Sequence, residues 1–130
     1  MELLMAFYQH LKQRGIADEK RLYIAGLSMG AMGTFEFLSR NPKDFAAAIA
    51  ICGGGTEELV PRYAGQTEIW IFHGVKDRVV PVEFSERMAA AIRKHGGNPR
   101  LTLYPKVDHN SWDNAFAEPD LLSWLFSKSK

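Results

Sequence analysis

Short apolar runs that alternate with helix-like segments constrain the fold of this chain more than any other feature of its sequence. The runs comprise residues 21–25, 45–51, 68–72 and 100–104. Each run is too short for a stable helix and is rich in residues that favour strands. Strands that alternate with helices form a parallel sheet, because each crossover helix returns the chain to the end of the sheet where the previous strand began. The sequence therefore predicts an α/β fold with about four parallel strands and helices on both faces of the sheet.

Helices are expected wherever apolar residues recur with helical spacing between and beyond these runs. Phe84, Met88 and Ile92 lie on one face of such a segment, which ends at Gly96. The other expected helices lie before Gly15, over residues 29–40, over a short stretch at 57–63, and over 111–126 with an interruption near Pro119.

The composition is that of one globular domain, since 46% of the 130 residues are hydrophobic and 24% are charged. The net charge is +1, without the basic surface that nucleic-acid binding requires. No run of about 18 apolar residues could span a membrane, and Glu2 stands where a signal peptide would carry positive charge. We therefore expect a cytoplasmic protein with no nucleic-acid partner. Cys52 is the only cysteine, so no intramolecular disulfide can form.

The segment Gly26-Leu27-Ser28-Met29-Gly30 follows the first expected strand and begins a helix. It fits the Gly-x-Ser-x-Gly pattern, in which a sharp turn exposes the serine hydroxyl at the carboxyl end of the sheet. Such a turn leaves no space for side chains two residues before and after the serine, which explains both glycines. Ser28 is thus a candidate nucleophile, and the Met29 N–H is a candidate oxyanion donor. Alternatively, the segment is a glycine-rich turn in which Ser28 only caps the helix.

Two further candidate catalytic residues follow other strands. Asp77 comes after the third expected strand, and His109 comes after the fourth. Because the carboxyl ends of parallel strands meet at one edge, these side chains and Ser28 are expected to lie together. In a triad of this kind His109 takes the proton of Ser28, while Asp77 orients the imidazole and stabilises its positive charge.

Other titratable residues near these strand ends have structural explanations. His73 ends the third strand and is expected to be a structural histidine that bonds nearby backbone. Asp108 precedes His109, but adjacent side chains on an extended loop point apart. A metal site formed by these two residues with Asp77 and His109 would match no standard ligand spacing. We therefore expect no metal, and the chemistry of such a triad needs no cofactor.

Two features near the candidate site allow alternative interpretations. The Gly53-Gly54-Gly55 run could present backbone N–H groups to the site, although a tight turn with positive φ is favoured. Trp112 lies shortly after His109 and could either cap the core or line a substrate pocket. The sequence does not separate these two roles, and Trp112 is retained as a candidate pocket residue.

These motifs resemble those of the α/β-hydrolase superfamily, specifically its branch of small serine esterases. That branch includes the phospholipase/carboxylesterase, feruloyl-esterase-like and polyhydroxybutyrate-depolymerase-like proteins. The similarity extends from about Asp18 onward and lies in residues 21–30, 45–55, 73–74, 77–81, 104–105, 109 and 112. The resemblance implies a single catalytic domain over residues 1–130, the carboxyl-terminal part of such a fold. Its implied activity is a serine carboxylesterase that hydrolyses small or short-chain acyl esters through an acyl-enzyme.

The resemblance also implies features that this chain lacks. Members of the superfamily carry about four further strands before the nucleophile strand, and the loop after the third of them supplies the other oxyanion N–H. A truncated fold leaves one side of residues 22–25 unpaired, and an apolar open edge is a template for pairing with another chain. We therefore expect a homodimer or higher homo-oligomer. The alternative function is a non-catalytic remnant or interaction module that needs a partner to complete the sheet.

Overall fold

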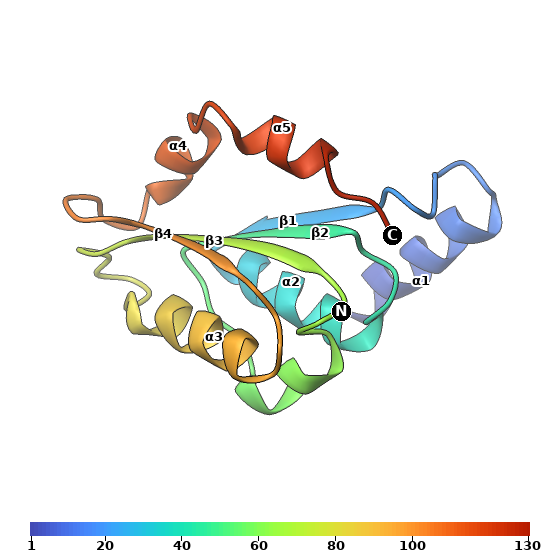
Figure 1. Cartoon of the computed structure of the whole chain (residues 1–130), viewed down its shortest axis with the longest axis horizontal. Coiled ribbons are helices and arrows are strands. Elements are labelled where there is room, and N and C mark those ends of the chain that lie inside the picture. The colour runs from blue at the N-terminus through green and yellow to red at the C-terminus, as the bar shows by residue number, and fades with distance from the viewer.

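The computed structural model describes residues 1–130 and contains one parallel sheet of four strands in the order β1-β2-β3-β4 (Figure 1). The strands are β1 Tyr23–Leu27, β2 Ala47–Ile51, β3 Glu68–Gly74 and β4 Arg100–Tyr104. All three strand pairs are parallel, so the four carboxyl ends lie at the same edge of the sheet. The α/β class predicted from the sequence is confirmed.

Helices cover both faces of this sheet, as the sequence predicts. They are α1 Glu2–Gln13, α2 Met29–Arg40, the 3₁₀ helix η1 Glu57–Arg62, α3 Glu83–Lys94, α4 Ser111–Phe116 and α5 Leu121–Phe126. The strands follow one another in chain order, and right-handed crossovers in one direction place their helices on one face. Accordingly, α2 and α3 lie on one face while α4 and α5, which follow the last strand, lie on the other (Figure 1). None of the helices combines the length and the apolar character needed to cross a lipid bilayer.

The main differences from the expected elements lie at strand ends, since β1 and β2 begin two residues later than the expected runs 21–25 and 45–51. β1 also continues through Gly26 to Leu27, and β3 continues beyond the expected run 68–72 to Gly74. Gly26 pairs with Ala50, and Gly74 pairs with Tyr104. Glycine in an extended conformation pairs like any other residue, so both glycines belong to their strands. These extensions carry the sheet directly up to the candidate site.

Alternate residues of β2 and β3 pack into two separate cores, one on each face of the sheet. Toward α2 and α3 lie Ala48, Ala50, Ile69 and Ile71. Toward α4 and α5 lie Ile49, Ile51, Trp70 and Phe72. Because both faces are covered, these central strands are apolar along their whole length rather than alternating in polarity.

The edge formed by β1 is the least covered part of the structure. β1 is paired with β2 only, and an apolar groove of about 410 Å³ runs beside it between α1 and α2. No residue of α1 is buried, and Leu3 and Phe7 are 85% and 57% exposed. α1 is attached through Tyr8, which packs against Phe45 and donates a hydrogen bond of 2.7 Å to Asp44. The open edge expected from the sequence is thus present.

Candidate active site

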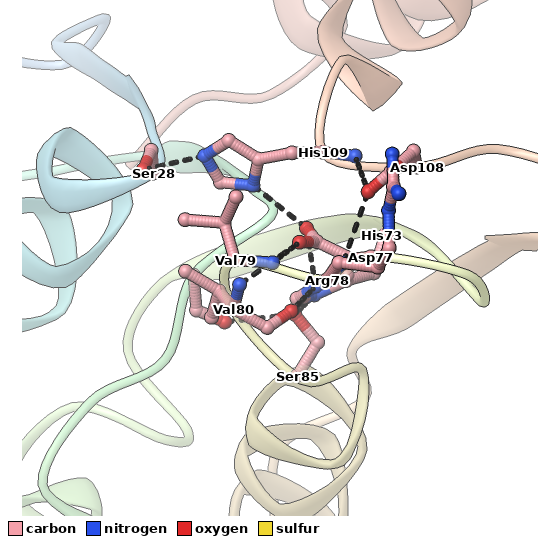
Figure 2. Close-up of polar contacts among 10 residues, drawn as sticks. Ser28, His73, Asp77, Arg78, Val79, Val80, Ser85, Asp108 and His109 are labelled. Carbon is pink, nitrogen blue, oxygen red and sulfur yellow. Dashed lines mark hydrogen bonds and ion pairs between the residues drawn. The ribbon is translucent and has the colours of Figure 1, made fainter.

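The structure brings together the three predicted side chains at the carboxyl edge of the sheet. Ser28 directly follows β1, Asp77 follows β3, and His109 follows β4. The Ser28 Oγ lies 2.9 Å from the Nε2 of His109, and the Nδ1 of His109 lies 2.8 Å from the Oδ2 of Asp77 (Figure 2). Hydroxyl, imidazole and carboxylate therefore form one continuous hydrogen-bonded chain.

Ser28 occupies a sharp turn between β1 and α2, in a backbone conformation that non-glycine residues rarely adopt. Its φ is 53° and its ψ is −120°. The Ser28 N–H donates a bond of 2.8 Å to the carbonyl of Ile51, which fixes the turn to β2. Ser28 holds the N-cap position of α2, but its side chain makes no capping bond and instead contacts His109. Strained backbone held by its surroundings is typical of functional sites.

Only one of the two motif glycines is required by space. A Cβ on Gly26 would collide with the carbonyl group of Gly30 and lie 2.7 Å from the Oγ1 of Thr34. A Cβ on Gly30 would meet no atom within 4 Å, because Gly30 faces the open groove beside β1. The steric explanation is therefore right for Gly26 and wrong for Gly30 in this structure.

The Gly53-Gly54-Gly55 segment is glycine-rich because of close packing and not because of its backbone angles. None of the three has positive φ, so the tight turn expected from the sequence is absent. A Cβ on Gly53 would lie 2.7 Å from the carbonyl oxygen of Ser28, and one on Gly54 would lie 2.8 Å from the Cβ of Phe84. The left-handed residue is instead Cys52, with φ 45°. Gly53 thus lets this segment pack directly against the carbonyl of Ser28.

The carboxylate of Asp77 is fully buried and held from both sides. Its Oδ1 accepts hydrogen bonds from the backbone N–H groups of Val79, at 2.9 Å, and Val80, at 2.8 Å (Figure 2). Burial acts to raise the pKa of Asp77, but the bonds from His109, Val80 and Val79 outweigh it and lower that pKa. Asp77 is therefore ionised at neutral pH. Its ionised carboxylate stabilises the folded state, and this stabilisation is lost as the pH falls through the lowered pKa of Asp77.

The residues expected to be structural have other partners in the structure. His73 is fully buried, with its Nδ1 2.6 Å from the Oγ of Ser85 and its Nε2 2.8 Å from the carbonyl of Val80. Asp108 accepts bonds from the backbone and side chain of Arg78, and these bonds lower the pKa of its carboxyl. Asp108 does not face the imidazole of His109. The backbone contact of His73 and the orientation of Asp108 agree with the expectation, but the Nε2 of His73 also lies 3.2 Å from the Oδ2 of Asp77.

No convincing metal site is formed around these groups. Asp108 is turned toward Arg78, so the four residues considered from the sequence do not converge on one point. Cys52, Asp77 and His109 do have ligand atoms within 4.8 Å of one another. Asp77 and His109 already bond each other, however, and burial raises the pKa of the Cys52 thiol, which disfavours the thiolate that a metal needs.

The sequence-based expectations did not include the N–H groups of Val79 and Val80 that hold Asp77, nor the contact of Ser85 with His73. The sequence carried a signal for the turn, because aspartate side chains commonly bond the backbone two and three residues ahead. Ser85 gave no such signal, since it lies in the first turn of an expected helix, where nothing in the sequence marks its partner. Its contact with His73 joins α3 to β3, which only the folded chain brings together.

Met29 and Trp112 flank the hydroxyl and imidazole. Met29 is the first residue of α2, where the backbone N–H groups lack partners within the helix and the helix dipole favours negative charge. Trp112 packs against the core beneath α4, and its ring meets that of His109 edge-on, with ring centroids 5.5 Å apart. It also lines a cavity of about 470 Å³ beside His109, Val79 and Arg78. Trp112 thus fits both roles that the sequence left open.

Comparisons with known proteins relate this chain to hydrolases. A sequence profile of the dienelactone hydrolase family matches residues 2–120. A Yersinia pestis protein, named as a candidate carboxymethylenebutenolidase, is 28% identical over 109 residues, which cover 77% of this chain and 40% of that protein. The crystal structure of a thermostable esterase matches the whole chain with a TM-score of 0.91 and 35% identity, over 38% of the esterase. Esterase PE8 matches 95% of the chain and 56% of its own length, with a TM-score of 0.74 and 25% identity. The chain therefore spans well under two thirds of each of these proteins.

Proposed function

Because this chain belongs to the dienelactone hydrolase family, a hydrolase family of the α/β-hydrolase superfamily, we propose that it is a serine carboxylesterase. Its substrates are small or short-chain acyl esters. The observation that carries the proposal is the chain of contacts from Ser28 through His109 to Asp77, with Ser28 held at positive φ. Nucleophile, base and orienting carboxylate within hydrogen-bond reach are the arrangement that activates a serine.

The proposed acylation follows from the positions of these atoms. The bond from Nδ1–H of His109 to Asp77 leaves the Nε2 lone pair facing the hydroxyl of Ser28. As Oγ forms its bond to the ester carbonyl carbon, Nε2 takes the hydroxyl proton, and the Met29 N–H stabilises the negative carbonyl oxygen. The bond to the alcohol oxygen then breaks, and His109 returns the proton to that oxygen. Alcohol and a Ser28 acyl ester are the products.

Deacylation repeats the same steps with water as the nucleophile. Nε2 of His109 takes a proton from water while the oxygen of that water attacks the acyl carbon. The bond to Oγ breaks, the proton passes to Ser28, and the carboxylic acid leaves. No further reactant is required.

We further propose that the leaving alcohol binds beside His109, in the cavity of about 470 Å³ that Trp112 and Val79 line, because His109 must reach the alcohol oxygen to return the proton. The exposed apolar surface of these side chains suits a small apolar alcohol. Trp112 is in this proposal a substrate-contacting residue.

Labelling with a fluorophosphonate probe tests the proposal directly. The probe phosphonylates activated serines, so we expect one adduct per chain, located on Ser28 by peptide mass spectrometry. Ser28→Ala should remove the adduct. Ser123→Ala, at an exposed serine of α5, is the matched control and should leave labelling unchanged. An unlabelled wild-type chain would favour the alternative of a non-catalytic interaction module.

We also propose that a second copy of this chain covers the open edge of β1. Unpaired backbone groups beside an apolar groove favour association with another chain, and a two-fold dimer is the simplest way to close the edge. Light scattering at micromolar concentration should then give twice the mass of one chain. Phe7→Glu, which places a charge in the apolar groove, should give the mass of one chain. A single-chain mass for the wild type contradicts the dimer.

A further inference from the structure

A buried histidine, His73, lies against the same carboxylate oxygen as His109. The Nε2 of His73 lies 3.2 Å from the Oδ2 of Asp77, and both side chains are fully buried. His73 belongs to β3, where it pairs with Leu103, so its position is fixed by the sheet. The carboxylate thus lies between two imidazoles, one facing Ser28 and one facing the interior (Figure 2).

The neighbours of His73 determine which ring nitrogen carries a proton toward Asp77. Nε2 faces two acceptors, the Asp77 carboxylate at 3.2 Å and the carbonyl of Val80 at 2.8 Å. Neither can donate, so Nε2 must carry the proton. The Nδ1 atom instead faces the hydroxyl of Ser85 at 2.6 Å, and that hydroxyl also reaches the carbonyl of Gly53 at 2.9 Å. With the proton of the neutral ring at Nε2, Nδ1 is an acceptor, so the single hydroxyl proton of Ser85 is shared between Nδ1 and the carbonyl of Gly53.

We infer that His73 is a positioning residue for the esterase reaction, and this inference rests on the proposed function. Its Nε2–H donates to the carbonyl of Val80, and Nε2 lies 3.2 Å from the oxygen of Asp77 that also bonds His109, so His73 restricts the movement of the carboxylate away from the catalytic imidazole. The same Nε2–H faces the carbonyl of Val80, whose own N–H donates to the other oxygen of Asp77. His73 therefore holds both the side chain and the turn that carries it.

This role differs from that of a histidine that only fills the core. A residue that only fills the core acts through its volume, so any variant of similar size would keep the geometry of the site. A positioning residue acts through one donor atom, so its effect depends on where the variant carries an N–H group. Glutamine places its amide nitrogen near the position of Nε2, whereas the shorter asparagine places it near Nδ1. The two variants therefore separate the roles.

The experiment compares His73→Gln with His73→Asn in two measurements. The first is the low-field proton resonance of the Nδ1–H of His109, which reports its bond to Asp77 without turnover. The second is kcat and KM for p-nitrophenyl butyrate. We expect His73→Gln to keep both near wild type. For His73→Asn we expect a shifted or exchange-broadened resonance and about a tenfold lower kcat. KM should stay unchanged, because the buried His73 touches no substrate.

The inference is overturned if folded His73→Asn keeps the wild-type resonance and kcat, or if both variants lose them equally. Should His73→Asn fail to fold, His73→Met is the second variant, because methionine fills a similar volume without an N–H group. A shifted His109 resonance in His73→Met supports the inference, and an unchanged one overturns it. If the wild type shows no turnover and no Ser28 labelling, the proposed function fails, while the resonance still tests the hold of His73 on Asp77.

Discussion

Ser28→Ala is expected to reduce hydrolysis of p-nitrophenyl butyrate to the background rate, a loss of about a thousandfold or more in kcat. The variant removes the atom that forms the acyl ester and leaves His109 without a hydroxyl to activate. Steady-state kinetics of the wild type beside the variant measure the effect. The variant also sets the background, because exposed lysine and histidine side chains cleave activated esters slowly without any active site.

Two controls make this result specific. Ser123→Ala should retain the wild-type rate, since Ser123 bonds only the backbone of α5. The double variant Ser28→Ala with His109→Ala should be no slower than Ser28→Ala alone, because residues that act as one unit have non-additive effects. Equal rates for the wild type and Ser28→Ala would instead show that Ser28 is not the nucleophile, and the function as an interaction module would then be preferred.

Gly26→Ala and Gly30→Ala are expected to change stability in opposite directions, although both glycines belong to the same motif. In Gly26→Ala the new methyl group collides with the backbone of Gly30, which cannot move without breaking the turn at Ser28. We expect a loss of about 3 kcal/mol or more in the free energy of unfolding. Gly30→Ala meets open space within α2 and should gain about 0.5–1 kcal/mol, the difference between alanine and glycine in a helix.

Urea denaturation followed by circular dichroism measures both changes as shifts of the unfolding midpoint. Thr34→Ala is a useful third variant, because it removes the hydroxyl oxygen that would lie 2.7 Å from a Cβ on Gly26. Combined with Gly26→Ala it should recover little stability, since the collision is mainly with backbone. A Gly26→Ala protein as stable as the wild type would contradict the steric account of the turn.

The elements and the site residues could be predicted from the sequence because their signals are local or ordered along the chain. Met29–Arg40 and Arg100–Tyr104 agree with the expected residues at both ends. Ser28, Asp77 and His109 could be placed together because each follows a strand, and parallel strands end at one edge. Membership of the hydrolase superfamily follows from the same ordered motifs and is confirmed by the family match.

What the sequence could not predict depends on approaches between distant segments. Gly53 needs to be glycine because the carbonyl of Ser28 lies against it, and Gly30 has free space because no segment packs there. The bond between Ser85 and His73 joins a helix to a strand at a point that no local pattern marks. Such contacts are properties of the packed chain, so a motif can name a glycine or histidine without giving the physical reason for it.

The order of strands in the sheet has a consequence for how the site forms during folding. Each strand pairs with the next one in the chain, so the sheet can grow stepwise by joining neighbouring segments. The bond between Ser28 and His109, however, spans 81 residues and links the loops that follow the two edge strands. It can close only after every strand has taken its register. Assembly of the hydrogen-bonded chain is therefore a late folding event, and intermediates with part of the sheet in place contain Ser28 without its base.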